Sequence, residues 1–163
     1  MVTDNQEPYL ASNELSSERY NVEYVKVPSE IGQDRAKAIA DDMLQVIAGE
    51  IPTTQQDILD QFKTNNNEFL LASDQTGKII GYATLFPRSD KPQACYLNKV
   101  ATNPGWRQKG VATQLIKEAQ ELYQEIFLVN IVRDERTREA MIKLYLKLGF
   151  ESQASTVFTW VRS

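Results

Sequence analysis

The 163-residue chain contains no histidine and a single cysteine, Cys95. Without histidine, a serine, cysteine or threonine nucleophile cannot be paired with an imidazole base. Zinc sites of the Cys/His type cannot be assembled within one chain, so we expect no metal. Cys95 cannot form an intrachain disulfide, which is typical of proteins in a reducing compartment. Any catalytic base must therefore be a carboxylate, a tyrosine, a lysine or water.

Long apolar runs and an excess of positive charge are also missing. A membrane-spanning helix needs roughly 20 apolar residues, whereas residues 126–129 form one of the longest apolar runs here. The net charge of −4 provides no general attraction for nucleic acid. Residues 1–21 are polar and acidic, unlike a secretory signal or a transit peptide. We therefore expect no membrane or nucleic-acid partner and a cytoplasmic location by default.

The composition is that of a globular protein. With 7 glycines and 6 prolines, the chain has too few of either for collagen-like or low-complexity classes. Hydrophobic residues make up 42% of the sequence, and the length suits one domain. Residues 1–20 show no sustained hydrophobic periodicity, so we expect a flexible tail there. Residues 21–163 contain no internal repeat or linker and are expected to form a single domain.

Hydrophobic spacing and turn residues divide this domain into helices and strands. Apolar side chains three and four residues apart predict a helix that begins near Pro28 and ends near Gly49. Thr53 and Gln56 resemble a capping box for a second helix. The other expected helices are about 110–123 and 138–148, the last one capped by Gly149, and the expected strands are 21–27, 68–73, 78–86, 94–102, 126–132 and one or two within 151–161.

This order of elements predicts a layered α+β fold. Strands 94–102 and 126–132 are joined by a helix, which favours parallel pairing between them. Alternation along strand 94–102 would place Tyr96, Asn98 and Val100 on one face of the sheet. Cys95 would then point to the opposite face, where we interpret it as a small core residue.

The most informative segment is 99–112, in which a strand leads through a turn into a helix. The turn contains two glycines and three side-chain donors, Arg107, Gln108 and Lys109. Backbone N–H groups of such a turn, together with the positive end of the helix dipole, can hold a pyrophosphate. A plain strand–helix connection with a basic loop explains the same residues equally well. The glycine spacing matches neither a Walker loop nor a dinucleotide fingerprint.

Two motifs resemble the GNAT family of N-acetyltransferases. Residues 107–112, Arg-Gln-Lys-Gly-Val-Ala, match the family signature R/Q-x-x-G-x-G/A, and residues 100–104 resemble the strand end that precedes it. Residues 140–150 are similar to the family's A-x-x-L-Y-x-K-x-G-F ending, with one extra residue after the alanine. The resemblance implies a mixed, mostly antiparallel sheet with a splayed parallel pair of strands, flanked by about four helices.

The resemblance also implies a site for acetyl-CoA. Backbone groups of Val100, Ala101 and Thr102 would contact the acetyl and pantetheine arm, where the family splays two parallel strands apart at a bulge. The pyrophosphate would be held by Arg107, Gln108, Lys109, Gly110, Val111, Ala112 and Thr113. Tyr145 stands where many members have a tyrosine that protonates the leaving thiolate as a general acid. Packing on the sheet is the alternative role for Tyr145.

The chain departs from the family pattern at three positions. Thr137 replaces an asparagine that contacts the cofactor in many relatives, and Thr102 replaces an apolar residue. Tyr96 occupies the position at which some branches have a glutamate base. A water chain that ends at Tyr96 or at a carboxylate such as Glu68 could accept the proton of the amine, and simple packing is the alternative for Tyr96. The sequence does not identify the base.

We therefore expect an N-acetyltransferase that moves the acetyl group of acetyl-CoA to a primary amine by direct attack in a ternary complex. The acceptor would be a small-molecule amine or a peptide amine, and a homodimer is left open. Asp41 and Asp42 could attract a cationic amine or simply form a solvated helix face. The alternatives are an acyltransferase with another donor or acceptor, and a non-catalytic regulatory module that binds acetyl-CoA.

Overall fold

A computed structural model describes residues 19–47, 53–63, 66–129, 135–154 and 156–163. Most of the expected tail, the expected stop at Gly49 and the end of strand 126–132 lie outside these residues. In chain order the elements are β1 (Tyr20–Val25), η1 (Pro28–Glu30), α2 (Gln33–Val46), α3 (Gln55–Lys63), β2 (Glu68–Asp74), β3 (Ile79–Pro87), β4 (Ala94–Thr102), η2 (Pro104–Trp106), α4 (Val111–Leu122), β5 (Glu125–Val129), α5 (Glu135–Lys147), β6 (Glu151–Ala154) and β7 (Val157–Val161).

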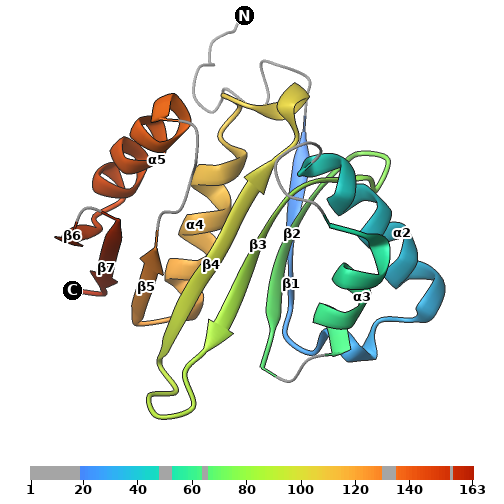
Figure 1. Ribbon diagram of the computed structural model, residues 1–163, viewed down its shortest axis with the longest axis horizontal. Coiled ribbons are helices and arrows are strands. Elements are labelled where there is room, and N and C mark those ends of the chain that lie inside the picture. Colours follow the sequence, from blue (N-terminus) through green and yellow to red (C-terminus); the bar gives the residue numbers. More distant parts are fainter. Residues whose placement is uncertain (1–18, 48–52, 64–65, 130–134, 155) are drawn as a thin grey trace, which may run out of the picture.

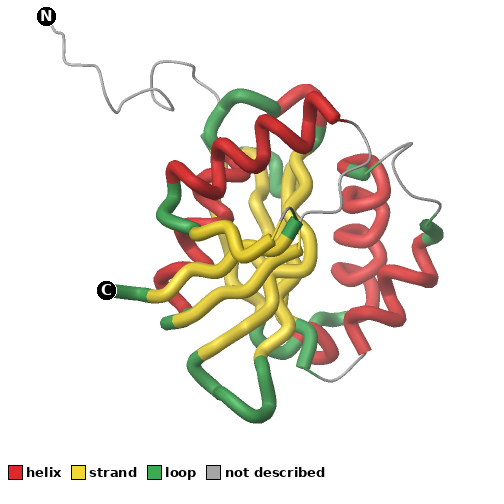
Figure 2. Tube along the Cα trace, turned by 60° about the vertical axis from the view of Figure 1, so that its left-hand side comes forward, coloured by secondary structure: helices red, strands yellow, loops and turns green. Residues whose placement is uncertain are grey.

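The described strands form one seven-stranded sheet in the order β1-β2-β3-β4-β5-β7-β6 (Figure 1). Strands β4 and β5 pair in parallel, and the other neighbours pair antiparallel. Helices lie on both faces of the sheet (Figure 2). This arrangement confirms the α+β fold with a parallel pair in a mostly antiparallel sheet. None of the described helices has the length and apolar character needed to cross a membrane.

The sheet separates two hydrophobic cores. Apolar side chains of α4 and α5 fill one core, which includes Leu115, Ile116, Ile126 and Phe158. Helices α2 and α3 fill the other against β2 and β3, with Met43, Ile58 and Phe69 among its members. Because α2 and α3 cover the β1–β3 side of the sheet, the front of β4, β5 and β7 is left without a helix in Figure 1.

Helix α4 packs tightly against the middle of the sheet. A Cβ atom added to Gly81 on β3 would lie 2.8 Å from Cγ1 of Val111 and 3.1 Å from the backbone oxygen of Ala101. Gly81 therefore allows the start of α4 to approach the sheet more closely than any other residue would. This contact brings the start of the helix next to the end of β4.

A β-bulge interrupts β4 at Asn98. On β3, Thr84 pairs with Lys99 and the next residue, Leu85, pairs with Leu97, so Asn98 is an extra residue in β4. An extra residue reverses the alternation of the side chains that follow it. The position of the bulge carries no mark in the local sequence.

The bulge changes which side chains share a face of the sheet. Cys95 and Val100 both pack in the core under α4 and α5, although they are separated by an odd number of positions. Tyr96 is 46% exposed. The predicted common face for Tyr96, Asn98 and Val100 is therefore wrong, because the prediction assumed an unbroken alternation. The opposite orientation of Cys95 and Tyr96 is confirmed, and Cys95 is fully buried.

Several local boundaries differ from the expectation. The capping box of α3 is formed one residue later: the Asp57 N–H donates to Oγ1 of Thr54 at 3.1 Å, and the Thr54 N–H donates to the Asp57 carboxylate at 2.8 Å. Pro28 opens a separate 3-10 turn, and α2 begins only at Gln33. The cap at Gly149 is confirmed by its φ of 92° and by the Phe150 N–H, which donates to the Tyr145 carbonyl at 3.0 Å.

Candidate active site

The parallel pair β4–β5 parts after a few residues. Residues 94–97 of β4 pair with residues 125–128 of β5, and the last pair is Leu97 with Leu128. Beyond it, β4 continues to Thr102 and stays paired only with β3 among the described strands. One edge of β4 thus has backbone N–H and C=O groups without a strand beside them from the bulge onward.

The turn after β4 is held in an unusual backbone conformation. The Gly105 N–H donates to Oδ1 of Asn103 at 2.9 Å, which stabilises the turn of η2. Gln108 has a φ of 62° and Gly110 a φ of 84°, both in the left-handed region. This region strongly favours glycine, so the position of Gly110 in the signature has a direct conformational cause.

The start of α4 is open. Gly110 is its N-cap residue, and no side chain among the described residues caps the helix. The first amide to reach an acceptor in this turn is that of Gln114, which donates to the Gly110 carbonyl at 2.9 Å. The amides of Val111, Ala112 and Thr113 have no hydrogen-bond acceptor within the described part of the chain. Such amides, with the positive end of the helix dipole, form an anion site.

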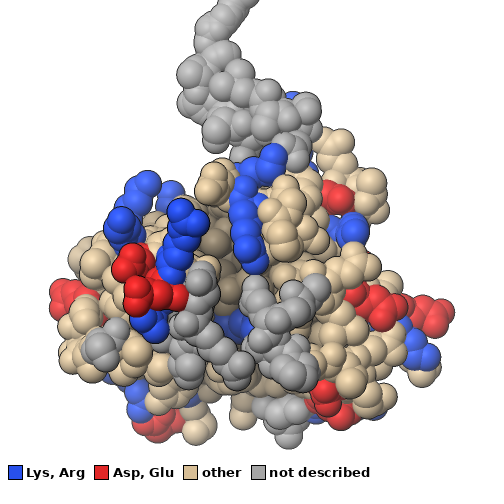
Figure 3. Space-filling model, turned by 45° about the horizontal axis from the view of Figure 1, so that its top comes forward, with Lys and Arg blue, Asp and Glu red and all other residues tan. Residues whose placement is uncertain are grey.

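Side chains around the start of α4 add positive charge and hydrogen-bond donors to this anion site. Arg107 and Gln108 are exposed, and Lys109 is half-buried. In the view onto this end of the molecule, several Lys and Arg side chains stand on the upper part of the face, with a group of acidic side chains among those on the left (Figure 3). The hydroxyl oxygen of Thr102 is buried and has no hydrogen-bond partner among the described residues. A buried hydroxyl without a partner is uncommon in folded proteins, and this one lies in the last residue of β4.

The two expected catalytic tyrosines lie in different environments. Tyr145 on α5 is only 6% exposed, and its ring contacts those of Phe150 and Phe158 at centroid distances of 5.8 and 5.6 Å. Burial raises the pKa of Tyr145 to about 12, so its hydroxyl stays protonated at neutral pH. The Tyr145 ring therefore has the packing role that was considered as an alternative.

Tyr96 lies on the open front of β4. Its ring contacts that of Phe127 on β5 at 5.7 Å, and the guanidinium carbon of Arg88 lies 5.7 Å from the Tyr96 centroid and 5.2 Å from that of Phe127. Since Tyr96 precedes the last parallel pair by one residue, this aromatic pair borders the point where the strands part. Tyr96 has both an exposed face and a packing role.

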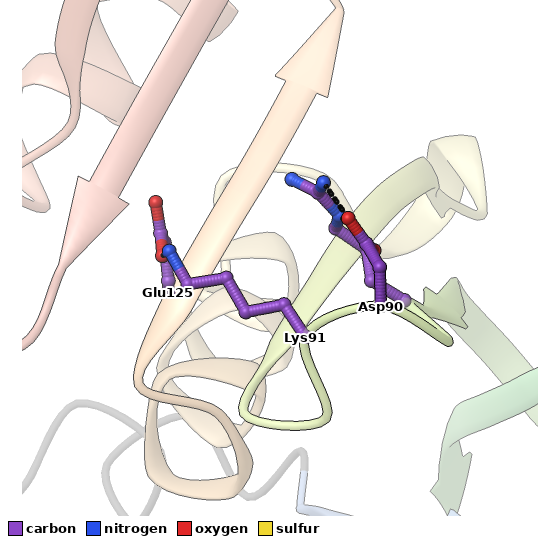
Figure 4. A network of polar contacts seen from close by, with 4 residues as sticks. Asp90, Lys91 and Glu125 are labelled. Atoms are coloured by element: carbon purple, nitrogen blue, oxygen red, sulfur yellow. Dashed lines mark hydrogen bonds and ion pairs between the residues drawn. The ribbon is translucent and has the colours of Figure 1, made fainter.

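Carboxylates near this aromatic pair are already in ion pairs. The Asp90 carboxylate accepts from Arg88 at 2.6 and 3.0 Å, and Glu125 accepts from Nζ of Lys91 at 2.5 Å. Figure 4 shows the two pairs flanking the strands. Glu125 is on β5 and Asp90 is in the loop before β4. Neither carboxylate is an unpaired base.

Glu68, the other carboxylate considered as a base, lies on the opposite face of the sheet. Its Oε1 atom accepts hydrogen bonds from the hydroxyls of Tyr24 at 2.8 Å and Tyr123 at 2.5 Å. Tyr123 follows the last residue of α4, so this cluster lies at the end of α4 far from the open amides. Tyr24 and Tyr123 were not predicted as site residues, and no local pattern in the sequence marks them.

Three further expectations have mixed outcomes. Asp42 accepts from the Ile79 N–H at 3.0 Å, and Asp41 accepts from the Gln55 side chain at 2.8 Å. Both carboxylates therefore have structural roles. Thr137 is exposed in the first turn of α5. Cys95 is buried, and burial raises its pKa to about 12, so it is no thiolate at neutral pH.

Two shallow hollows lie on the described surface, and the first borders the opening turn of α4. One of about 220 Å³ is lined by Tyr20, Asn21, Val22, Gln114 and Glu118. The other, of about 370 Å³, lies between β1 and η1. A pyrophosphate held by backbone amides lies along the surface, so the open helix start does not depend on a closed cavity.

Comparison with solved structures places this fold among known acetyltransferases. The ribosomal-protein alanine N-acetyltransferase of Escherichia coli superposes with a TM-score of 0.64 at 15% identity, over 89% of this chain and 95% of that one. The PaiA N-acetyltransferase of Thermoplasma acidophilum, solved with coenzyme A, gives 0.56 at 15% identity over 86% and 99%. An aminoglycoside N-acetyltransferase in complex with CoA gives 0.60 at 18% identity over 86% and 93%.

Sequence comparison gives the family directly. No curated protein sequence matches the chain. A family model described as the acetyltransferase (GNAT) family matches residues 37–150, more than half of the chain. The matched region contains the open edge of β4, the open start of α4 and Tyr145. The chain is therefore a member of the GNAT acetyltransferase family.

Proposed function

We propose that this protein is an acetyl-CoA-dependent N-acetyltransferase that acts on a primary amine in a ternary complex. The observation that carries the proposal is the continuity of two open backbone features. The edge of β4 beyond Leu97, which has no described strand beside it, leads through the turn at Gly110 to the amides of α4 that no described side chain caps. A thioester arm and a diphosphate require hydrogen-bond donors in that order along one path.

Binding of coenzyme A would rest mainly on backbone groups. The amides of Gly110, Val111, Ala112 and Thr113 would donate to the pyrophosphate, with Arg107, Gln108 and Lys109 beside them. The edge of β4 from Val100 to Thr102 would hold the pantetheine and polarise the thioester carbonyl. Thr137, in the first turn of α5, stands where many relatives have an asparagine that contacts the cofactor.

Catalysis would come first from holding the thioester and the amine together. The amine nitrogen forms a bond to the thioester carbonyl carbon, the carbon–sulfur bond breaks, and coenzyme A leaves as a thiol. The ammonium passes one proton to water, and the departing sulfur takes one proton from solvent. Well-oriented reactions of this kind reach effective molarities of roughly 10⁵–10⁸ M, so positioning supplies most of the rate.

Tyr145 would stabilise the leaving sulfur. Its raised pKa of about 12 keeps the hydroxyl protonated, but an ordinary thiol has a pKa of about 8.5. Complete proton transfer from this tyrosine to a thiolate is therefore unfavourable in energy. We infer that its hydroxyl donates a hydrogen bond as negative charge develops on the sulfur, which strengthens as the bond breaks.

The acceptor amine would have to reach the site largely deprotonated. The carboxylates that flank the aromatic pair are paired with Arg88 and Lys91, and Tyr96 would accept a proton only through water. An α-amine has a pKa of about 7.7–8.0, against about 10.4 for a lysine side chain. An α-amine of a peptide or a small amine of similar pKa therefore needs the least help from a base.

The test is the release of free thiol from acetyl-CoA across amines of graded pKa, including dipeptides, lysine derivatives and aminoglycosides. We expect turnover with at least one amine and the highest kcat/KM at neutral pH for amines of low pKa. The variant Tyr145→Phe, which lacks only the hydroxyl, should lower kcat about tenfold or more. Its KM for acetyl-CoA should stay within about twofold of the wild-type value.

The second candidate is a regulatory module that binds acetyl-CoA without turnover. It is favoured by Tyr96, which stands where some relatives have a carboxylate base. Binding of CoA by calorimetry without thiol release for any amine in the panel would support it. Turnover with any amine would exclude it, and absence of CoA binding would exclude both candidates. Measured transfer of a longer acyl group, or transfer to a hydroxyl, would identify a different acyltransferase.

A further inference from the structure

A tyrosine from the first strand reaches the turn that would bind the pyrophosphate. Tyr20 is the first residue of β1, and its hydroxyl donates to the carbonyl oxygen of Gly110 at 3.2 Å. The two residues are 90 positions apart in sequence. The ring of Tyr20 meets that of Trp106 edge-on, with 6.3 Å between centroids and an interplanar angle of 83°. Two contacts thus connect β1 to this turn.

The hydrogen bond acts on the peptide unit that carries the first open amide of α4. The carbonyl of Gly110 and the N–H of Val111 belong to the same peptide group, which is planar and trans. The carbonyl and the N–H therefore point in opposite directions. Holding the Gly110 oxygen toward Tyr20 and the Gln114 amide directs the Val111 N–H away from the helix, toward an incoming anion.

This outside support is placed where the turn has little support of its own. Asn103 fixes the first part of the turn through the Gly105 amide. Gln108 and Gly110 have left-handed backbones, and the helix has no side-chain cap. The Trp106 ring fixes the position of the Tyr20 ring, since edge-to-face aromatic pairs hold a defined geometry. Donation to the carbonyl also polarises the shared peptide and strengthens its N–H as a donor.

We propose that Tyr20 is a positioning residue for coenzyme A, which holds the Gly110–Val111 peptide in the orientation that binds the diphosphate. The inference rests on the proposed function, because it names the ligand of the open amides. Tyr20 is expected to touch no reacting atom. Its removal should therefore change the affinity for coenzyme A and leave the chemical step unchanged.

The experiment compares two variants of the full chain, Tyr20→Phe and Tyr24→Phe, each of which removes one tyrosine hydroxyl. Both tyrosines are on β1, and both donate across to the region of α4, but at its opposite ends: Tyr20 to Gly110 and Tyr24 to Glu68. Calorimetry with coenzyme A gives Kd, steady-state kinetics with acetyl-CoA gives KM and kcat, and thermal unfolding gives Tm for each protein.

For Tyr20→Phe we expect Kd and KM to rise about three- to tenfold, the size of one ordinary hydrogen bond, with kcat within twofold of the wild type. For Tyr24→Phe we expect a lower Tm and Kd within twofold. Trp106→Leu removes the ring support and keeps the Tyr20 hydroxyl, so we expect a smaller rise in Kd. This second variant also tests the inference if Tyr20→Phe expresses poorly.

The outcomes separate the inference from the function on which it rests. A wild-type protein that does not bind coenzyme A contradicts the proposed function. Binding by the wild type with an unchanged Kd in Tyr20→Phe and Trp106→Leu overturns the role of Tyr20 alone. Equal losses of affinity in the Tyr20 and Tyr24 variants would also overturn it, because they would reflect general destabilisation and no local positioning.

Discussion

The two ends of helix α4 are built in opposite ways. At the C-terminal end, the Arg162 guanidinium donates to the carbonyls of Gln120 and Glu121 at 2.7 and 2.9 Å and reaches that of Tyr123 at 3.3 Å. A cation there satisfies the free carbonyls and complements the negative end of the dipole. At the N-terminal end, the corresponding amides have no side-chain cap. The chain thus closes one end of the helix and leaves the other open.

Strand β1 contacts each end of α4 through a tyrosine. One contact completes a buried hydrogen-bond cluster, and the other leaves amides open. Tyr24 donates to Glu68, which is 6% exposed and also accepts from Tyr123, so that end holds a buried and satisfied polar cluster. Tyr20 donates to a backbone carbonyl at the surface and leaves the neighbouring amides without acceptors. The closed end therefore serves stability, and the open end is the part available to a ligand.

The largest effect that would sharpen this contrast is expected from Glu68→Ala. The variant leaves the hydroxyls of Tyr24 and Tyr123 without their acceptor, and an unsatisfied buried group costs about 1–3 kcal/mol. We expect the free energy of unfolding to fall by roughly 3 kcal/mol in denaturant titrations, with the Kd for coenzyme A unchanged. The control is Glu23→Ala at the exposed pair with Arg35, expected within about 0.5 kcal/mol. A large change in Kd would show that the two ends are coupled.

The next effect concerns the open end and the variant Gly110→Ala. A Cβ atom there meets only the Tyr20 hydroxyl at 3.8 Å, so the cost is the left-handed backbone at a φ of 84°, about 1–2 kcal/mol. We expect the turn to relax and the Kd for coenzyme A to rise about tenfold or more.

Two glycines provide matched controls for Gly110→Ala. Gly77→Ala has the same left-handed strain, with a φ of 90° and free space around it, but it lies in the turn between β2 and β3 and not in the segment that leads into α4. Gly105→Ala lies in the same turn without that strain, and its Cβ would make an ordinary 3.5 Å contact with Asn103. Only Gly110→Ala should lose affinity; an equal loss in Gly77→Ala would mean that the open end has no special role.

The open end could be predicted from the sequence much better than the closed end. The boundaries of β4 were predicted residue by residue, and Gly110 and Gly149 were identified as special positions, because their signals are local: a strand that ends at the turn 103–105, a turn glycine and a helix stop. The resemblance to a family motif added the expectation that acetyl-CoA binds there. None of these signals requires knowledge of which distant residues come together.

Long-range contacts were not predictable in the same way. Glu68 stands at the start of an apolar strand and resembles a surface charge, since its tyrosine partners lie 44 and 55 positions away. The contact of Tyr20 with Gly110 spans 90 positions. The bulge at Asn98 depends on the register with β3, and for that reason the predicted common face of Tyr96 and Val100 failed. The shift of the capping box from Thr53 to Thr54 arose because adjacent threonines offer the same chemistry.

A smaller effect is expected at the closed end from Arg162→Met, which keeps a long side chain and removes three hydrogen bonds to carbonyls. Arg162 is exposed, so water replaces part of the lost bonding, and we expect a loss of about 1 kcal/mol in the free energy of unfolding. Arg35→Met at a surface ion pair is the control, with about 0.5 kcal/mol or less. If both variants lose the same amount, the cation at the helix end contributes nothing specific.

The smallest effect is a change in how steeply the free energy of unfolding falls with pH under alkaline conditions. Burial and the hydrogen bond to Glu68 raise the pKa of Tyr24 and of Tyr123 above the ordinary value. Below about pH 10 both the folded and the unfolded chain keep these protons. Above it the unfolded chain releases them and the folded chain does not, so stability falls as the pH rises. Denaturant titrations from pH 8 to 11 should show this decline in the wild type, and Tyr123→Phe should start lower and decline less steeply. A decline of equal steepness in both proteins would place the responsible protons elsewhere than at the closed end of α4.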